Sequence, residues 1–173
     1  MRTRLFTAAA IMALVVPSVV QAQSATVQAS ATVQASLTAT TTNALSFGTL
    51  AMGANGTISS SGAGALSAPG VAGRGQVHVQ HNSNVGVTAS VPSVLTNSAS
   101  GSTLPFSATC AIASTSGGSG TDVAGCASFA FPAAAVGTVQ STWILVGGTV
   151  TGQASSGIGT FNGDVVFTLT STN

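Results

Sequence analysis

Residues 24–40 read SATVQASATVQASLTAT, a stretch in which polar and apolar side chains alternate without a break. The odd positions, from Ala25 to Ala39, are all apolar, and the even positions carry Ser, Thr or Gln. This period of two is typical of a β-strand with one buried face. At about 3.3 Å per residue the stretch would span roughly 56 Å, whereas a typical strand spans ~17–20 Å. Either the stretch bends and serves two sheets, or part of it pairs outside its own domain.

A duplication accounts for much of this length. The hexad ATVQAS of residues 25–30 recurs at residues 31–36. Two copies are too few for a solenoid, which needs at least about three repeats. An alternating strand can lengthen by six residues without changing the face that each side chain occupies.

Residues 1–22 have the pattern of a bacterial signal peptide. Arg2 and Arg4 form a charged start, an apolar run covers residues 5–16, and Val20-Gln21-Ala22 supplies small residues for cleavage. The run is too short for a membrane-spanning helix, so no direct membrane anchor is expected. The chain is therefore predicted to be exported through a cleaved signal peptide to the periplasm, and from there to the cell surface or the extracellular space.

Charged residues make up only 3% of the chain. Beyond the leader, the formal charges are Arg74, Asp122 and Asp164 alone. No basic patch is present, so nucleic acid is not an expected partner. Acid–base groups are nearly absent, which argues against an enzyme and gives no reason to expect a cofactor. A near-neutral surface rich in Ser and Thr suits a protein that packs against copies of itself.

Cys110 and Cys126 are the only two cysteines. In an exported protein the default expectation is a disulfide between them. Closing a loop of about 15 residues stabilises a fold by ~3 kcal/mol in the chain-entropy model. A metal site would need more ligands close by in the sequence, and none are present, so no metal is expected.

No segment beyond the leader shows a convincing helical period. Short apolar or alternating runs separated by turn residues predict about seven to nine strands and an all-β sandwich. Asn55-Gly56 predicts a turn, and Asn82-Ser83-Asn84 predicts a hairpin between the strands on either side. The expected strands cover residues 57–60, 76–81, 85–91, 104–112, 127–131, 142–151 and 160–172.

His78 and His81 are the first residues to test for chemistry. They are three positions apart on an expected strand, so they should point to opposite faces and not bind one metal ion; we interpret them as surface or turn histidines. Asp122 is expected in a solvated turn and Asp164 on the outward face of the last strand. Trp143 and the seven phenylalanines are expected in the core. We therefore predict no catalytic residue.

Two sets of short motifs resemble the bacterial family called "domain of unknown function 4402". Leu45-Ser46-Phe47-Gly48-Thr49-Leu50 resembles its opening, and residues 146–150, followed by residues 159–163 and an alternating last strand, resemble its close. Phe161 stands where this family usually has Tyr, and the Cys110–Cys126 insertion departs from the commonest pattern. The family is similar in pattern to spore-coat-U-like proteins and to archaic chaperone–usher pilins.

The resemblance implies an immunoglobulin-like antiparallel β-sandwich that lacks one strand and is completed by the N-terminal extension of a neighbour. It implies homopolymers, with a periplasmic chaperone and an outer-membrane usher as helpers, and brings no catalytic residues. On this interpretation residues 1–22 are the signal peptide, 23–34 the donor extension and 35–173 the sandwich domain. The candidate inserts of the donor strand are Ala25, Val27, Ala29, Ala31 and Val33.

Two functions stay open. The first is a structural subunit of a pilus-like, fimbria-like or coat-like surface assembly that polymerises by donor-strand complementation. The second is a monomeric secreted adhesin or binding module, in which residues 24–40 fold back on their own sheet. Exposed aromatic side chains or a ligand cleft would favour the second.

Overall fold

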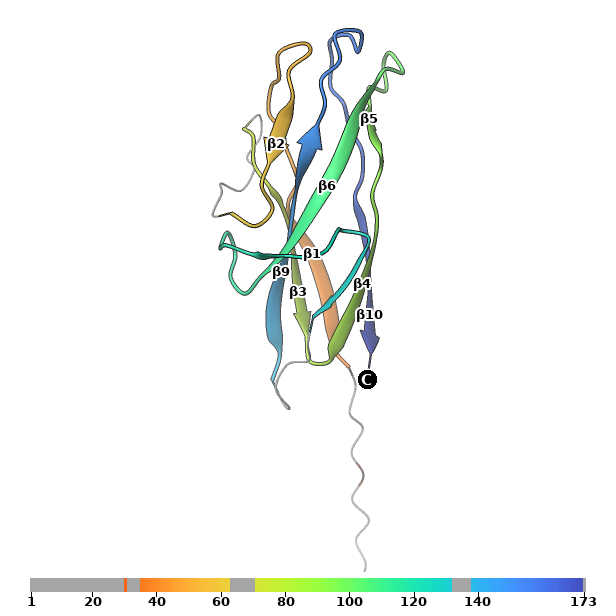
Figure 1. Ribbon diagram of the computed structural model, residues 1–173. Helices are drawn as coiled ribbons and strands as arrows, with labels where there is room; N and C mark the ends of the chain where they lie inside the picture. Colours follow the sequence, from red (N-terminus) through yellow and green to blue (C-terminus); the bar gives the residue numbers. More distant parts are fainter. Residues whose placement is uncertain (1–29, 31–34, 63–70, 132–137, 173) are drawn as a thin grey trace, which may run out of the picture. The chain divides into compact units, whose positions relative to one another are not determined.

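The computed structural model describes residue 30 and residues 35–62, 71–131 and 138–172. The predicted leader, and all five candidate inserts of the donor strand, lie outside these ranges. The chain divides into two compact units, residues 1–33 and residues 34–173, and every described strand belongs to the second (Figure 1). None of the described residues forms a helix that is long and apolar enough to cross a membrane.

The described residues form strands and no helix, as predicted. The strands are β1 (Leu37–Asn43), β2 (Gly56–Ile58), β3 (Gly75–His81), β4 (Asn84–Ser90), β5 (Val94–Thr96), β6 (Thr103–Ala113), β7 (Thr121–Asp122), β8 (Ser128–Phe131), β9 (Gln140–Val150) and β10 (Val166–Thr172).

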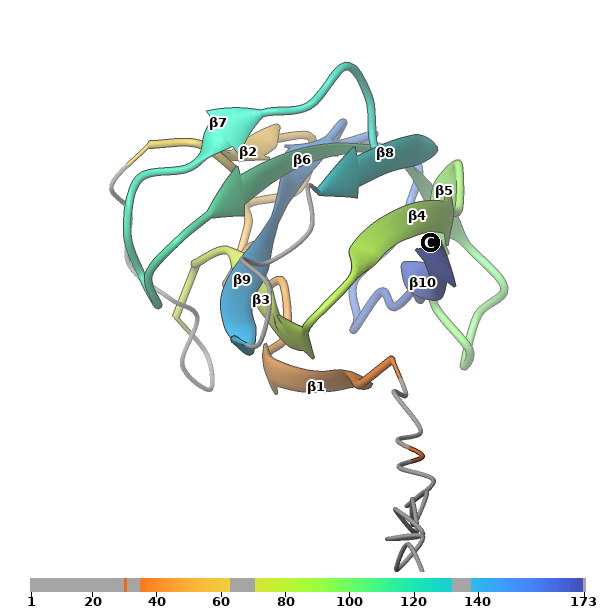
Figure 2. The same cartoon turned by 90° about the horizontal axis from the view of Figure 1, so that it is seen from below.

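The strands form two antiparallel sheets that face each other (Figure 2). The larger sheet has seven strands in the order β1-β3-β9-β6-β5, with β2 added to β9 and β7 added to β6. The smaller sheet has three strands in the order β10-β4-β8. Among the described strands, β1 pairs only with β3 and β10 pairs only with β4. Each therefore forms an edge of its sheet.

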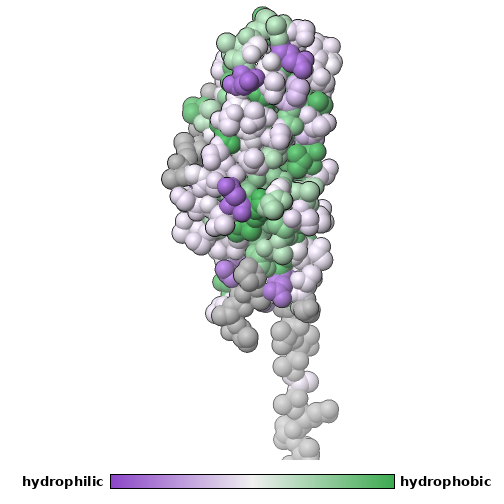
Figure 3. All heavy atoms as spheres, viewed as in Figure 1, coloured by the Kyte–Doolittle hydropathy of each residue, from purple (hydrophilic) through white to green (hydrophobic). Residues whose placement is uncertain are grey.

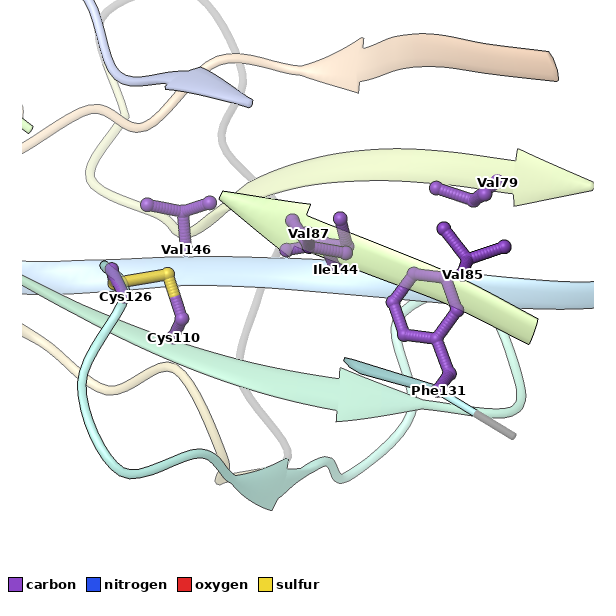
Figure 4. Close-up of a cluster of buried hydrophobic side chains, with 8 residues drawn as sticks. All are labelled: Val79, Val85, Val87, Cys110, Cys126, Phe131, Ile144 and Val146. Atoms are coloured by element: carbon purple, nitrogen blue, oxygen red, sulfur yellow. A yellow bond between two sulfur atoms is a disulfide. The ribbon is translucent and has the colours of Figure 1, made fainter. Parts of the chain in front are cut away.

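The hydrophobic core lies between the two sheets (Figure 4). Val85 and Val87 of β4 are buried, whereas the alternate residue Thr88 is exposed, because one face of the strand meets the larger sheet. Full burial of such a side chain stabilises a fold by about 1.5–3 kcal/mol. The buried cluster consists of Val79, Val85, Val87, Cys110, Cys126, Phe131, Ile144 and Val146.

The predicted disulfide between Cys110 and Cys126 is present. Cys110 belongs to β6 of the larger sheet, and Cys126 lies two residues before β8 of the smaller sheet. Their Cα atoms are 5.1 Å apart, and both residues are almost fully buried. The bond therefore joins the two layers through the core as well as closing a loop.

The predicted hairpin at residues 82–84 is wrong. The strands on either side of it, β3 and β4, have the expected positions but belong to different sheets and do not pair. Val79 and Val85 instead belong to one buried cluster between the layers. The connection is an arch between the sheets, because both strands carry buried valines that must face the same core.

The predicted turn at Asn55-Gly56 is also wrong. The chain turns at Met52 and Gly53, where Gly53 has φ +78°, a conformation that favours glycine. Gly56 instead begins β2, and the Asn55 side chain accepts a hydrogen bond of 3.0 Å from the backbone N–H of Gly152.

Most strand boundaries differ from the prediction by one or two residues, and the largest difference is at the last strand. The last strand starts at Val166 and not at residue 160, because residues 160–165 pair with the rest of the fold only through Asn162. The short strands β5 and β7 were not predicted.

Candidate functional site

A groove of about 730 Å³ with a mixed polar and apolar lining lies where the edge strand β1 ends and the edge strand β10 begins. Its base includes Val77 of β3, Phe106 of β6, and Val146 and Val150 of β9. It touches the last residues of β1, the first residues of β3 and the first part of β10. The groove therefore lies toward the end of the sandwich that is remote from the β3–β4 arch.

The first wall of the groove is formed by residues 44–54, which follow β1. This segment contains the apolar side chains of Leu45, Phe47 and Leu50, but only Ser46 forms a bridge, with Gly73 through two backbone hydrogen bonds of 2.9 and 2.8 Å. A Cβ atom at Gly75 would lie 2.9 Å from the backbone nitrogen of Leu45. The glycine thus allows the wall to pass close over the start of β3.

The second wall is formed by residues 156–167, which lead into β10. Asn162 is fixed to Thr96 of β5 by two backbone hydrogen bonds of 2.8 and 3.0 Å. Phe161, Val165 and Phe167 line the groove from this side and are half-buried. Both walls are therefore held by backbone contacts, and their apolar side chains meet the groove.

The inward positions of the edge strands are only partly covered. Ala39 of β1 pairs with the fully buried Val79, so both residues point to the same face of the sheet, yet Ala39 is exposed. In β10, Phe167 and Leu169 point inward and are half-buried, whereas Thr168 and Thr170 are exposed. The alternation predicted for the last strand is confirmed over residues 166–172. Neither edge is fully packed by the described residues.

The expectation that the phenylalanines are core residues is confirmed only in part, since Phe129 and Phe167 pack against the core without being fully buried. Among the described residues, Phe106 and Phe131 are buried, whereas Phe47, Phe129, Phe161 and Phe167 are half-buried. Phe47 contacts Phe106 edge to face, with ring centroids 6.0 Å apart. Three of these half-buried rings, Phe47, Phe161 and Phe167, line the groove.

Trp143 is likewise outside the core between the sheets. It packs on Ala111, Ala113 and Leu145, and its ring stacks on His78 with the centroids 4.6 Å apart. Trp143 pairs with His78 across β9 and β3, so both side chains leave the same, outer face of the larger sheet.

The prediction that the two histidines point to opposite faces is confirmed, but their interpretation as surface or turn residues is wrong for His81. His81 is fully buried beside Phe131. Its Nδ1 atom lies 2.8 Å from the carbonyl oxygen of Ser83, and its Nε2 atom lies 3.1 Å from Oγ1 of Thr142. Within the described ranges, no three His, Cys, Asp or Glu residues lie close enough to hold a metal ion.

The two carboxylates are both exposed. Asp122 lies in β7 and not in a turn, and it accepts a hydrogen bond of 3.3 Å from the Ser60 hydroxyl. Asp164 lies beside the groove, two residues before β10, and not on the outward face of that strand. They come from different segments and form no acid–base pair.

Arg74 was not identified from the sequence as a structural centre. It is fully buried, and its guanidinium donates to the carbonyl oxygens of Ser60 and Gly62 at 3.3 and 2.5 Å. The same group donates to the carbonyl oxygens of Gly117 and Gly118 at 2.6 and 2.7 Å. Burial lowers the pKa of the guanidinium. The sequence contained one signal for this structural role. Arg74 lies in a glycine-rich region and has no acidic residue near it in the sequence, so backbone carbonyl groups were its available partners.

The molecular face shown in Figure 3 is mostly pale, with small strongly hydrophilic areas and some apolar areas. This agrees with the low charge of the sequence. Comparison of the chain with family models, with curated proteins and with solved structures finds no match.

Proposed function

We propose that this protein is an exported structural subunit of a cell-surface assembly, and that it polymerises by receiving the N-terminal strand of a neighbouring copy. The observation that carries the proposal is the groove at the end of β1 and the start of β10, which exposes apolar side chains beside two edge strands that each have one described partner. An incoming strand would pair with an edge and insert alternate side chains into the groove. No step of this function needs a cofactor or a catalytic group.

The strand order supports an immunoglobulin-like sandwich with one position empty. In that fold one sheet has the order A-B-E-D and the other contains C, F and G. The order β1-β3-β9-β6 corresponds to A-B-E-D, and the pair β4 and β10 corresponds to C and F. No described strand occupies the G position beside β10. This is the position at which a donated strand would complete the sandwich.

The two ends of the sandwich support a head-to-tail arrangement. The Ser36 N–H donates to the Asn82 side chain at 2.7 Å, and Asn82 belongs to the arch between β3 and β4. The domain therefore begins at the end of the sandwich that carries this arch. The groove lies toward the opposite end. A strand leaving one subunit at its arch would enter the next subunit from its groove end. It would then run antiparallel to β10, which starts beside the groove and ends at Thr172, opposite Asn84.

The monomeric alternative requires residues 24–36 to reverse direction and return along their own domain. Residues 23–42 contain no Gly, Pro, Asn or Asp. These residues dominate tight turns, because they supply the backbone angles or the side-chain hydrogen bonds that a reversal needs. The composition therefore favours a strand that continues outward to a neighbour.

An unpaired edge and a groove that exposes apolar side chains promote aggregation before assembly. We therefore expect a periplasmic chaperone that covers the groove, and an outer-membrane usher that exchanges the chaperone for a donor strand. The motif resemblance to the family "domain of unknown function 4402" points the same way.

Deleting residues 23–35 from the full-length precursor tests the proposal. We expect the deletion variant to be exported and folded, as judged by its circular dichroism, but to be strictly monomeric. Wild-type protein should give a ladder of heat-sensitive multimers on gels. A strictly monomeric wild type would contradict the proposal and favour the adhesin or binding module. Unchanged multimers in the deletion variant would contradict donation by this segment.

A further inference from the structure

The duplication at the N-terminus gives the chain two copies of one strand. The odd positions of the first hexad are Ala25, Val27 and Ala29, and those of the second are Ala31, Val33 and Ala35. The even positions are also identical, with Thr, Gln and Ser in each copy. The two hexads therefore present the same two faces to any partner.

We propose that each hexad is a complete donor unit and that the groove of a second copy accepts either one, in two registers six residues apart. This inference rests on the proposed strand donation. In one register the groove holds residues 25–30 of the neighbouring copy. In the other register it holds residues 31–36, which end at the residue that contacts Asn82.

The geometry of a strand makes the two registers equivalent inside the groove. A shift by an even number of residues keeps every side chain on the same face. Here a shift by six also restores the same side chain at each place. One hexad extends over roughly 20 Å, comparable to the length of a typical strand and to the seven-residue β10 beside the groove. One hexad is therefore long enough to serve the groove.

The registers differ outside the groove. When the first hexad is inserted, residues 31–35 connect the insert to Ser36, where the donor subunit begins its contact with Asn82. When the second hexad is inserted, almost no connection is left and the subunits abut. The spacing between neighbouring subunits should differ by about 20 Å, the extended length of six residues. Under load, a filament of this protein could then lengthen by changing from the second register to the first. Each groove would again hold one donor strand after the change.

Aspartate substitutions in the full-length protein test the redundancy. A carboxylate at Val27 or Val33 would enter the groove beside apolar side chains and without a partner, so each substitution should block one register only. We expect Val27→Asp and Val33→Asp each to lower the association constant for multimer formation by about twofold, since one of two equivalent states is lost, and therefore to keep most of the multimers. The double variant should form no multimers. Gln28→Asp and Gln34→Asp add the same charge on the other face and should retain the wild-type fraction.

The outcomes separate this inference from the proposed function. If either single variant abolishes multimers, only one register exists and the inference is wrong, although strand donation stands. If the double variant still forms wild-type multimers, donation by this segment is wrong as well. Electron microscopy gives a second readout: Val27→Asp filaments should have the shorter subunit spacing and Val33→Asp filaments the longer. The same spacing in both variants would overturn the inference.

Deleting one hexad provides a matched control. Removing residues 25–30 or residues 31–36 produces the same chain, because the hexads are identical. This variant keeps one donor unit directly before β1 and should polymerise with the shorter spacing only. Loss of multimers in this variant would show that the connection is obligatory and would overturn the second register.

Discussion

Ser36 and Asn82 are joined by two hydrogen bonds, one from the Ser36 N–H to the Asn82 side chain at 2.7 Å and one from the Asn82 N–H to the Ser36 carbonyl at 3.3 Å. This contact ties the start of the domain to the arch between β3 and β4. It determines where the N-terminal segment leaves the sandwich, at the end remote from the groove.

Replacing Asn82 with Ala should weaken this attachment without unfolding the domain. The side-chain hydrogen bond is exposed, so we expect a loss of about 0.5–1.5 kcal/mol in the free energy of unfolding. The measurement is urea unfolding, with hydrogen exchange of the Ser36 amide as a local probe. Wild-type protection of that amide in the variant would show that the Asn82 side chain does not hold the segment.

The disulfide should be a major stabilising element, because it joins the two sheets through the core. We expect the Cys110→Ala, Cys126→Ala double variant to lose about 2–4 kcal/mol in the free energy of unfolding. Urea unfolding of the oxidised wild type and of the double variant measures the difference. Equal midpoints and slopes would contradict the prediction. The groove proposed to accept a strand is lined by other residues, so a folded double variant should still form multimers if that proposal is right.

Arg74 should be required for folding stability. Substitution by Met removes all four hydrogen bonds to the carbonyl oxygens of residues 60, 62, 117 and 118, and leaves one buried and three part-buried interactions unmade. We expect a loss of at least about 2 kcal/mol in the free energy of unfolding. Arg74→Lys should not restore it, because an ammonium group lacks the planar fork that serves several acceptors. Full recovery in the lysine variant would show that charge alone matters.

Arg74 also provides a probe of the unfolding of the domain, because it is a cleavage site for trypsin. The chain contains no Lys, and Arg74 is its only Arg beyond residue 4. Because this residue is fully buried, trypsin should cleave the folded domain only when it opens. The cleavage rate in increasing urea should therefore follow the unfolded fraction. Rapid cleavage in the absence of urea would contradict the buried position of Arg74.

Local patterns in the sequence were sufficient for the main strands and for the disulfide. The alternation of Val77, Val79, Val85 and Val87 with polar residues predicted β3 and β4 almost to their ends. The same pattern could not assign these strands to sheets, because a short turn serves a hairpin and an arch equally well. Their assignment depends on β9 and β10, which lie far along the chain.

Sequence patterns were limited in the same way in predicting the candidate site. The motif at residues 45–50 was visible, but its place as a groove wall depends on the contact of Ser46 with Gly73. The burial of His81 and Arg74 depends on Thr142 and on the loop at residues 117–118, again distant in sequence. Residue patterns thus predicted the strands, whereas long-range packing determined the open edge.

The close passage of the first wall over β3 can be tested with a glycine pair. A Cβ atom at Gly75 would lie 2.9 Å from the backbone nitrogen of Leu45, whereas a Cβ atom at Gly86 would meet nothing closer than a carbonyl oxygen at 3.9 Å. We expect Gly75→Ala to destabilise the domain by about 1–3 kcal/mol and to reduce multimers. Gly86→Ala is the control and should be tolerated. Equal thermal unfolding of the two variants would contradict this account of the wall.

Two adjacent valines give the sharpest test of the groove. Val165 lines the groove and is half-buried, whereas Val166 begins β10 and is 55% exposed. In the proposed assembly, Val165→Asp would add a second carboxylate, beside Asp164, at a position that faces the apolar side chains of the incoming strand, and that strand offers it no cation. We expect this variant to fold but to form no multimers. Val166→Asp carries the same charge one residue away, on the outer face, and should polymerise like the wild type.

The fraction of heat-sensitive multimers is the readout, and circular dichroism confirms folding. If Val165→Asp folds and polymerises normally, this groove is not the acceptor; if both variants lose multimers, the outer face of β10 takes part in assembly and a different interface must be sought.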